Sequence, residues 1–163
     1  MQQTTYDQVR TLYRALLVFA TVGVLILVAG LVEFAYFEPP GQSSGLHARI
    51  VGVFAYDPGT GMVKGADQPE FSRTDQFAAV VDWSSLPPGT AVDARWYDSF
   101  GDIVGRAGPA TAGQLANQGV VPVIVPKGLQ HSLAGHYTFV VERLSGGVPV
   151  EVLGRRIVLV RRA

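Results

Sequence analysis

The chain has 163 residues, and thirteen lysine and arginine residues balance thirteen aspartates and glutamates. A formal net charge of zero gives no indication of a nucleic-acid partner. Cysteine is absent, which excludes disulfides, thiolate metal sites, iron–sulfur clusters and cysteine nucleophiles.

A long apolar segment lies near the N-terminus. No charged residue occurs between Arg14 and Glu33, and residues 15–32 would cover ~27 Å as a helix, close to the thickness of the bilayer hydrocarbon. A signal peptide has a shorter apolar core and a small-residue cleavage site, which this segment lacks, so we expect an uncleaved anchor. The predicted organisation is a cytoplasmic tail at 1–14, a transmembrane helix at 15–37 and a linker at 38–46.

The residues around this segment predict its orientation. Arg10 and Arg14 precede it and Glu33 follows it, so the N-terminus should be cytoplasmic and the C-terminal domain periplasmic or extracellular in a single-pass cell-membrane protein. Aromatic residues at the two ends are expected to lie at the membrane interfaces: Tyr13, Phe34, Tyr36 and Phe37. Three small residues lie along one stripe of the segment: Ala20, Gly23 and Gly30. They would let another helix pack closely, although small residues are common in any membrane helix.

Residues 47–163 are predicted to form one all-β domain. Alternating and β-branched runs follow one another with turn signals between them, and no convincing helix occurs. In residues 91–97, Val92, Ala94 and Trp96 face one way, and Asp93, Arg95 and Tyr97 face the other. About seven short strands at this spacing favour an antiparallel β-sandwich.

Two segments resemble immunoglobulin-like and fibronectin-like domains. Residues 94–104 resemble strand C and the turn after it, and residues 133–141 resemble strand F. The resemblance implies that Trp96 is the core tryptophan, that Tyr137 is the corner tyrosine and that Phe139 lies in the core beside them. Because the disulfide of antibody domains is missing, a generic bacterial immunoglobulin-like sandwich is the better comparison.

The residues that could support chemistry are few. His47, His131 and His136 could converge on a metal ion, but a spacing of five between the last two fits no regular element, so we expect ordinary surface histidines. No catalytic motif occurs, which favours a protein that is not an enzyme and has no cofactor. The long loop 57–75 is a candidate contact loop.

Basic residues gather near the C-terminus: Arg155, Arg156, Arg161 and Arg162. One interpretation is that their charges cancel those of acidic residues on neighbouring strands. The other is that they form a patch that docks on an acidic partner or on lipid headgroups. We expect a non-catalytic, single-pass accessory subunit of an integral membrane protein complex, for example a respiratory or photosynthetic one, in contact with the lipid bilayer and not with nucleic acid. The alternative is a membrane-tethered binding module for a ligand, a glycan or a metal.

Overall fold

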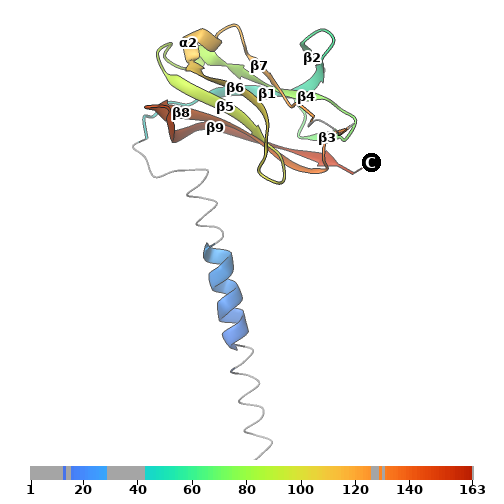
Figure 1. The fold of residues 1–163 in the computed structure, drawn as a ribbon, viewed down its shortest axis with the longest axis vertical. Helices are drawn as coiled ribbons and strands as arrows, with labels where there is room; N and C mark the ends of the chain where they lie inside the picture. Colours follow the sequence, from blue (N-terminus) through green and yellow to red (C-terminus); the bar gives the residue numbers. More distant parts are fainter. Residues whose placement is uncertain (1–12, 14–15, 29–42, 126–128, 130, 163) are drawn as a thin grey trace, which may run out of the picture. The chain divides into compact units, whose positions relative to one another are not determined.

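The computed structural model describes residues 13, 16–28, 43–125, 129 and 131–162. The chain divides into two units, Met1–Pro39 and Pro40–Ala163. In the first unit, residues 16–28 are helical (Figure 1). The second unit contains two β-sheets.

The prediction of a transmembrane helix at 15–37 is wrong. Among the described residues, no helix is both long enough and apolar enough to cross a membrane. The predicted single-pass membrane location, with its cytoplasmic N-terminus and its periplasmic or extracellular domain, depended on that helix and is contradicted with it.

Part of the predicted interface and packing set belongs to the described helix. Ala20 and Gly23 lie within it, and the side chain of Tyr13 is exposed. The remaining residues of that set lie outside the described residues: Gly30, Phe34, Tyr36 and Phe37.

The second unit is a β-sandwich, which confirms the all-β prediction for this part of the chain (Figure 1). The four-stranded sheet has the order β2-β1-β4-β7, formed by β1 (Arg49–Asp57), β2 (Met62–Lys64), β4 (Phe77–Asp82) and β7 (Val120–Pro122). The five-stranded sheet has the order β3-β9-β8-β5-β6, formed by β3 (Glu70–Ser72), β5 (Ala91–Tyr97), β6 (Ile103–Thr111), β8 (Gly135–Ser145) and β9 (Val148–Arg161).

The strand pairing is antiparallel except at one edge. There the short strand β3 runs parallel to the end of β9. Both β2 and β3 lie within residues 57–75, where the sequence predicted only a loop. Two short helical segments, η1 (Trp83–Ser85) and α2 (Ala112–Leu115), complete the described part of this unit.

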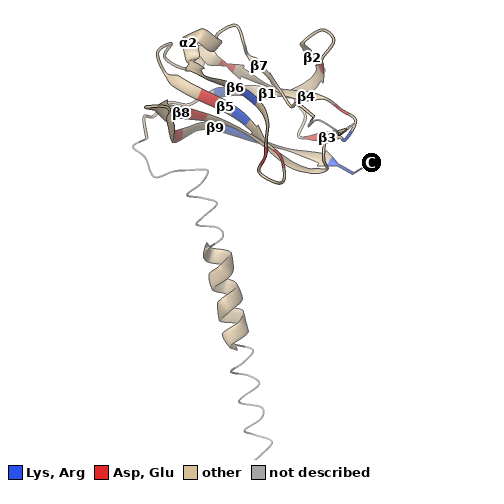
Figure 2. Ribbon diagram, viewed as in Figure 1, with Lys and Arg blue, Asp and Glu red and all other residues tan. Residues whose placement is uncertain are grey.

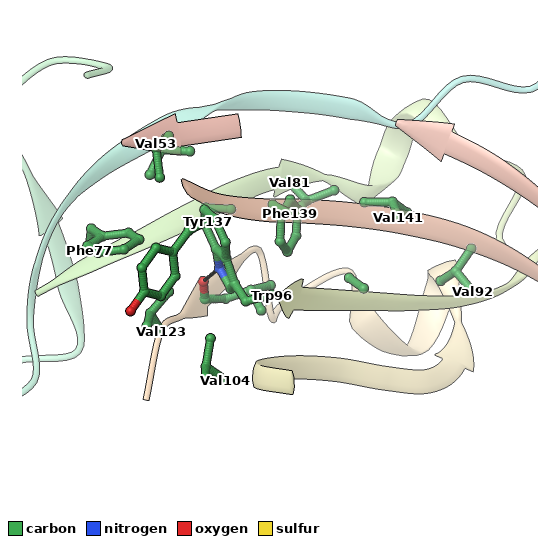
Figure 3. Packing of buried hydrophobic residues seen from close by; sticks show 14 of the residues in the cluster. Val53, Phe77, Val81, Val92, Trp96, Val104, Val123, Tyr137, Phe139 and Val141 are labelled. Atoms are coloured by element: carbon green, nitrogen blue, oxygen red, sulfur yellow. Dashed lines mark hydrogen bonds between the residues drawn. The ribbon is translucent and has the colours of Figure 1, made fainter. Parts of the chain in front are cut away.

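The core lies between the two sheets and is centred on aromatic residues (Figure 3). The ring of Phe77 on β4 lies edge-on to the rings of Trp96 and Tyr137, at centroid distances of 5.6 and 5.5 Å. Phe139 lies 5.0 Å from Trp96. The indole Nε1 of Trp96 donates a hydrogen bond of 2.9 Å to the carbonyl of Val121, so the polar atom of this ring is satisfied and the two sheets are joined.

Strands β8 and β9 are the longest of the unit and form a hairpin. Gly146 and Gly147 connect them, with φ angles of +60° and +83°. A two-residue hairpin turn with positive φ at both central positions matches the right-handed twist of the strands, and glycine adopts it without steric cost. The turn sets the pairing of Ser145 with Val148, and two register shifts farther along, at Arg143/Leu144 and Val141/Glu142, determine which side chains lie next to each other on the rest of the sheet.

Candidate functional site: an arginine row on the five-stranded sheet

The face of the five-stranded sheet that points away from the core carries two ordered rows of side chains. On β5, Val92, Ala94 and Trp96 belong to the core, so the alternate residues lie on the outer face. Residues directly opposite one another on neighbouring strands share a face. The arginine row, read across β6, β5, β8 and β9, consists of Arg106, Arg95, Val140 and Arg155. The apolar row beside it consists of Ile103, Tyr97, Thr138 and Ile157.

A buried aspartate holds two of the arginines in place. Asp93 on β5 is 0% exposed. Its Oδ1 accepts a hydrogen bond of 2.9 Å from Nε of Arg106, and its Oδ2 accepts one of 2.7 Å from Nη2 of the same side chain. Arg95 donates to Oδ2 from Nε, at 2.7 Å, and from Nη2. The two arginines are cross-strand neighbours and would repel each other if the carboxylate were not between them.

These contacts favour the charged state of both arginines. The hydrogen bonds to Asp93 raise the pKa of Arg106 above its ordinary value. Burial lowers the pKa of Arg95, but hydrogen bonds to Tyr97 and Asp93 outweigh that effect and raise it. The row therefore carries fixed positive charge at every physiological pH.

A second buried carboxylate lies directly across from the first. Glu142 on β8 is the cross-strand partner of Asp93 and is 9% exposed. Its Oε2 has no hydrogen-bond partner among the described residues, and Nη1 of Arg95 lies 3.4 Å away. Burial raises the pKa of Glu142, Arg95 opposes the shift, and the negative charge of Asp93 adds to it. Figure 2 shows acidic and basic residues next to one another on β5, with further charged residues on the neighbouring strands.

The outer face is therefore only partly open to solvent. Val140 and Tyr97 are buried there although neither belongs to the core cluster between the sheets. Ile103 and Ile157, at the two ends of the apolar row, remain about half exposed, at 51% and 47%. The face thus combines a rigid, hydrogen-bonded interior with exposed aliphatic side chains.

The structure does not bring the predicted histidines together into a metal site. His47, His131 and His136 are all exposed. Among the described residues, no group of three or more histidine, aspartate or glutamate side chains could hold a metal ion.

The four predicted basic residues do not form one patch. Arg155 belongs to the arginine row, whereas Arg156 lies on the opposite face of β9, where its Nη2 is 2.6 Å from Oδ2 of Asp67. Arg161 pairs with Glu70 on β3, and Arg162 is exposed. For Arg156 and Arg161 the first interpretation applies, since the charge of each is cancelled by an acidic residue from another part of the chain.

The loop before β3 is tied to both sheets by one side chain. Oδ1 of Asp67 accepts a hydrogen bond of 2.8 Å from the backbone N–H of Val53 on β1, while its Oδ2 binds Arg156 on β9. A Cβ on Gly52 would lie 2.8 Å from the Asp67 carboxyl, so the absence of a side chain at Gly52 makes room for this bridge. The candidate contact loop 57–75 is thereby fixed at Asp67.

Sequence reasoning placed Asp93 and Arg95 on the outer face but did not identify them as a site. Arg106 and Glu142, which complete the cluster, were missed altogether. The available signal was the presence of charged residues at alternate positions of strands that are otherwise apolar, since a charge in a central strand is costly unless it is paired.

Neither a protein-family model nor a curated protein sequence matches this chain. The function is therefore inferred from the geometry of the outer face.

Proposed function

We propose that the β-sandwich is a non-catalytic accessory subunit that docks on a partner protein through the outer face of its five-stranded sheet. The observation that carries the proposal is the buried cluster of Asp93, Glu142, Arg95 and Arg106 on a face that lies outside the core. Burying such a cluster costs desolvation energy. Apolar side chains of similar volume at these positions would stabilise the fold at least as well. The benefit of the cluster is a surface whose shape and charge are fixed before a partner arrives.

The composition of the face agrees with this function. Arginine and tyrosine are enriched among the residues that contribute most to protein interfaces, and the surrounding contacts mainly exclude water. Here Arg106 and Arg155 of the arginine row are accessible, and Ile103 and Ile157 are exposed at the two ends of the apolar row. Each row crosses four strands and so extends over about 14 Å, a width suited to the centre of a standard interface.

We also propose that the sandwich is of the immunoglobulin-like type. The pairing of β4 with β7 in one sheet, and the order β9-β8-β5 in the other, correspond to strands B and E and to strands G, F and C of such domains. Trp96 on β5 then occupies the position of the core tryptophan. Tyr137 at the start of β8 hydrogen-bonds with the backbone of Leu133, as a corner tyrosine does, while burial raises its pKa.

The docking proposal is tested by site-specific photo-crosslinking of the tagged full chain in its own cells. One crosslinking residue replaces Ile157, and a second, as the control, replaces Met62, which is 64% exposed on β2 of the other sheet. We expect one protein, at fixed stoichiometry, to be crosslinked from position 157 and not from position 62. The same protein should co-purify with the uncrosslinked chain, be lost on Ile157→Asp and be retained on Met62→Asp. Identical products from both positions, or a chain that purifies alone as a monomer, would contradict docking through this face.

A further inference from the structure

On the outer face of the five-stranded sheet, the acidic side chains of the cluster are buried and the basic side chains at the ends of the arginine row are accessible. The two acids of the cluster, Asp93 and Glu142, are 0% and 9% exposed. The side chain of Arg106 above them is 43% exposed, and Arg155 at the other end of the arginine row is also exposed. The positive groups of the row are therefore those that a partner meets first.

Arg106 is oriented before any partner binds. Its Nε and Nη2 are held by the two oxygens of Asp93, whereas its Nη1 donates to no group among the described residues. A guanidinium fixed on one edge offers its other edge as a donor whose direction is already set, so little side-chain entropy is lost when an anion binds. Carboxylates match this planar geometry and form short, charge-assisted hydrogen bonds with it.

Exposed aliphatic side chains lie in the row next to the arginine row. Ile103 lies on the same strand as Arg106, three residues earlier, and Ile157 closes the apolar row at the opposite end. A bare phosphate or a nucleic-acid backbone would leave these side chains in water, whereas a protein segment with both acidic and aliphatic residues would cover them.

We propose that the face recognises an acidic segment of the partner protein, in which one carboxylate binds the outer edge of Arg106 and aliphatic side chains cover the apolar row. The inference rests on the docking function proposed above and names the chemistry of the partner.

The test is the binding of short labelled peptides to the full chain, measured by fluorescence anisotropy at low ionic strength. The probes are acetyl-Glu-Ile-Glu-Ile-Glu-amide and its counterpart with glutamine in place of every glutamate. We expect the glutamate peptide to bind and the glutamine peptide not to bind. Arg106→Gln should weaken the binding about tenfold, as expected for loss of one charge-assisted contact. Arg106→Lys, which keeps the charge but loses the planar fork, should fall between the two.

The matched control is Arg49→Gln. The Arg49 side chain is 73% exposed on the four-stranded sheet, 3.9 Å from Asp82, so its replacement removes the same charge from a different face and should leave peptide binding unchanged. Ile157→Gln leaves the Asp93 contacts in place, and it should weaken binding about fivefold through loss of apolar contact. Tryptophan fluorescence of each variant verifies that it is folded.

Three results would overturn the inference: equal binding of the two peptides, equal weakening by Arg49→Gln and Arg106→Gln, or no binding of the glutamate peptide. Tighter binding of a short DNA duplex than of the glutamate peptide would also overturn it and would assign the face to nucleic acid. The proposed docking function can fail separately. Suppose that position 157 still crosslinks a partner, and that Arg106→Gln does not weaken the binding of this partner. Docking through the face is then retained, and recognition of an acidic segment is rejected.

Discussion

Replacing Asp93 with asparagine tests the energetics of the arginine row most directly. The carboxylate is 0% exposed and accepts hydrogen bonds from both Arg95 and Arg106. Removing one partner of a buried ion pair costs about 3–5 kcal/mol because the remaining charge is left uncompensated. The side chains of Arg95 and Arg106 are 19% and 43% exposed, so water partly replaces the lost partner. We therefore expect the free energy of unfolding to fall by about 3 kcal/mol, the lower end of that range.

Urea denaturation followed by tryptophan fluorescence measures this change. Both tryptophans of the chain, Trp83 and Trp96, are buried in the β-sandwich, at 3% and 0% exposure, so the signal reports on the unfolding of this unit. In a thermal scan, the same loss should lower the Tm by roughly 10 °C, given about 3–6 °C per kcal/mol for a domain of this size.

Asp57→Asn is the matched control. Asp57 forms an ion pair of 2.6 Å with Lys64, whose side chain is 66% exposed, while that of Asp57 is 31% exposed, and pairs that water reaches in this way contribute little to stability. We expect a small change in the urea midpoint for Asp57→Asn and a large one for Asp93→Asn. Equal midpoints for the two variants would refute the reasoning that burial of Asp93 makes its arginine contacts important.

Three further substitutions test other parts of the structure by the same urea assay. Gly52→Ala places a Cβ where the Asp67 carboxyl lies, so we expect the bridge between the sheets to shift and stability to fall by about 1 kcal/mol; a stability equal to that of the wild type would show that the bridge is dispensable. Trp96→Phe removes the hydrogen bond from the indole Nε1 to the carbonyl of Val121 and leaves a cavity in the core, at a cost of about 2 kcal/mol; a smaller loss than that of an exposed substitution would contradict this account. Glu142→Gln should raise stability at pH 7, since the pKa of Glu142 is raised in the folded state and its ionised form therefore opposes folding. As the pH falls through the raised folded pKa towards the ordinary value of 4.5, Glu142 of the wild type is protonated and the penalty is lost. The free energies of unfolding of the two proteins should therefore converge at low pH, and a difference that stays constant with pH would contradict the assignment.

The local properties of the β-sandwich followed from the sequence. Side chains alternate along a strand with a period of two, so the positions of Val92, Ala94 and Trp96 already indicated which residues of β5 face the core. Turn residues such as Gly146 and Gly147 marked where the chain reverses. The all-β class of this unit therefore required no tertiary information, whereas the short strands β2 and β3 lie where the sequence predicted only a loop.

The N-terminal prediction failed for a different reason. An uncharged run is a property of the sequence, and it does not by itself determine the extent of a helix. Among the described residues, no helix is both long enough and apolar enough to cross a membrane.

The arginine row depended on the tertiary structure alone. Arg95 and Arg106 lie on consecutive strands and Arg155 is distant in the sequence, and the three fall in one row only because β6, β5, β8 and β9 are adjacent in one sheet with a particular register. Alternation determines the face on which a side chain lies, because it is a property of a single strand. Which side chains share that face at hydrogen-bonding distance is determined by the pairing of strands, and pairing depends on contacts between distant parts of the chain.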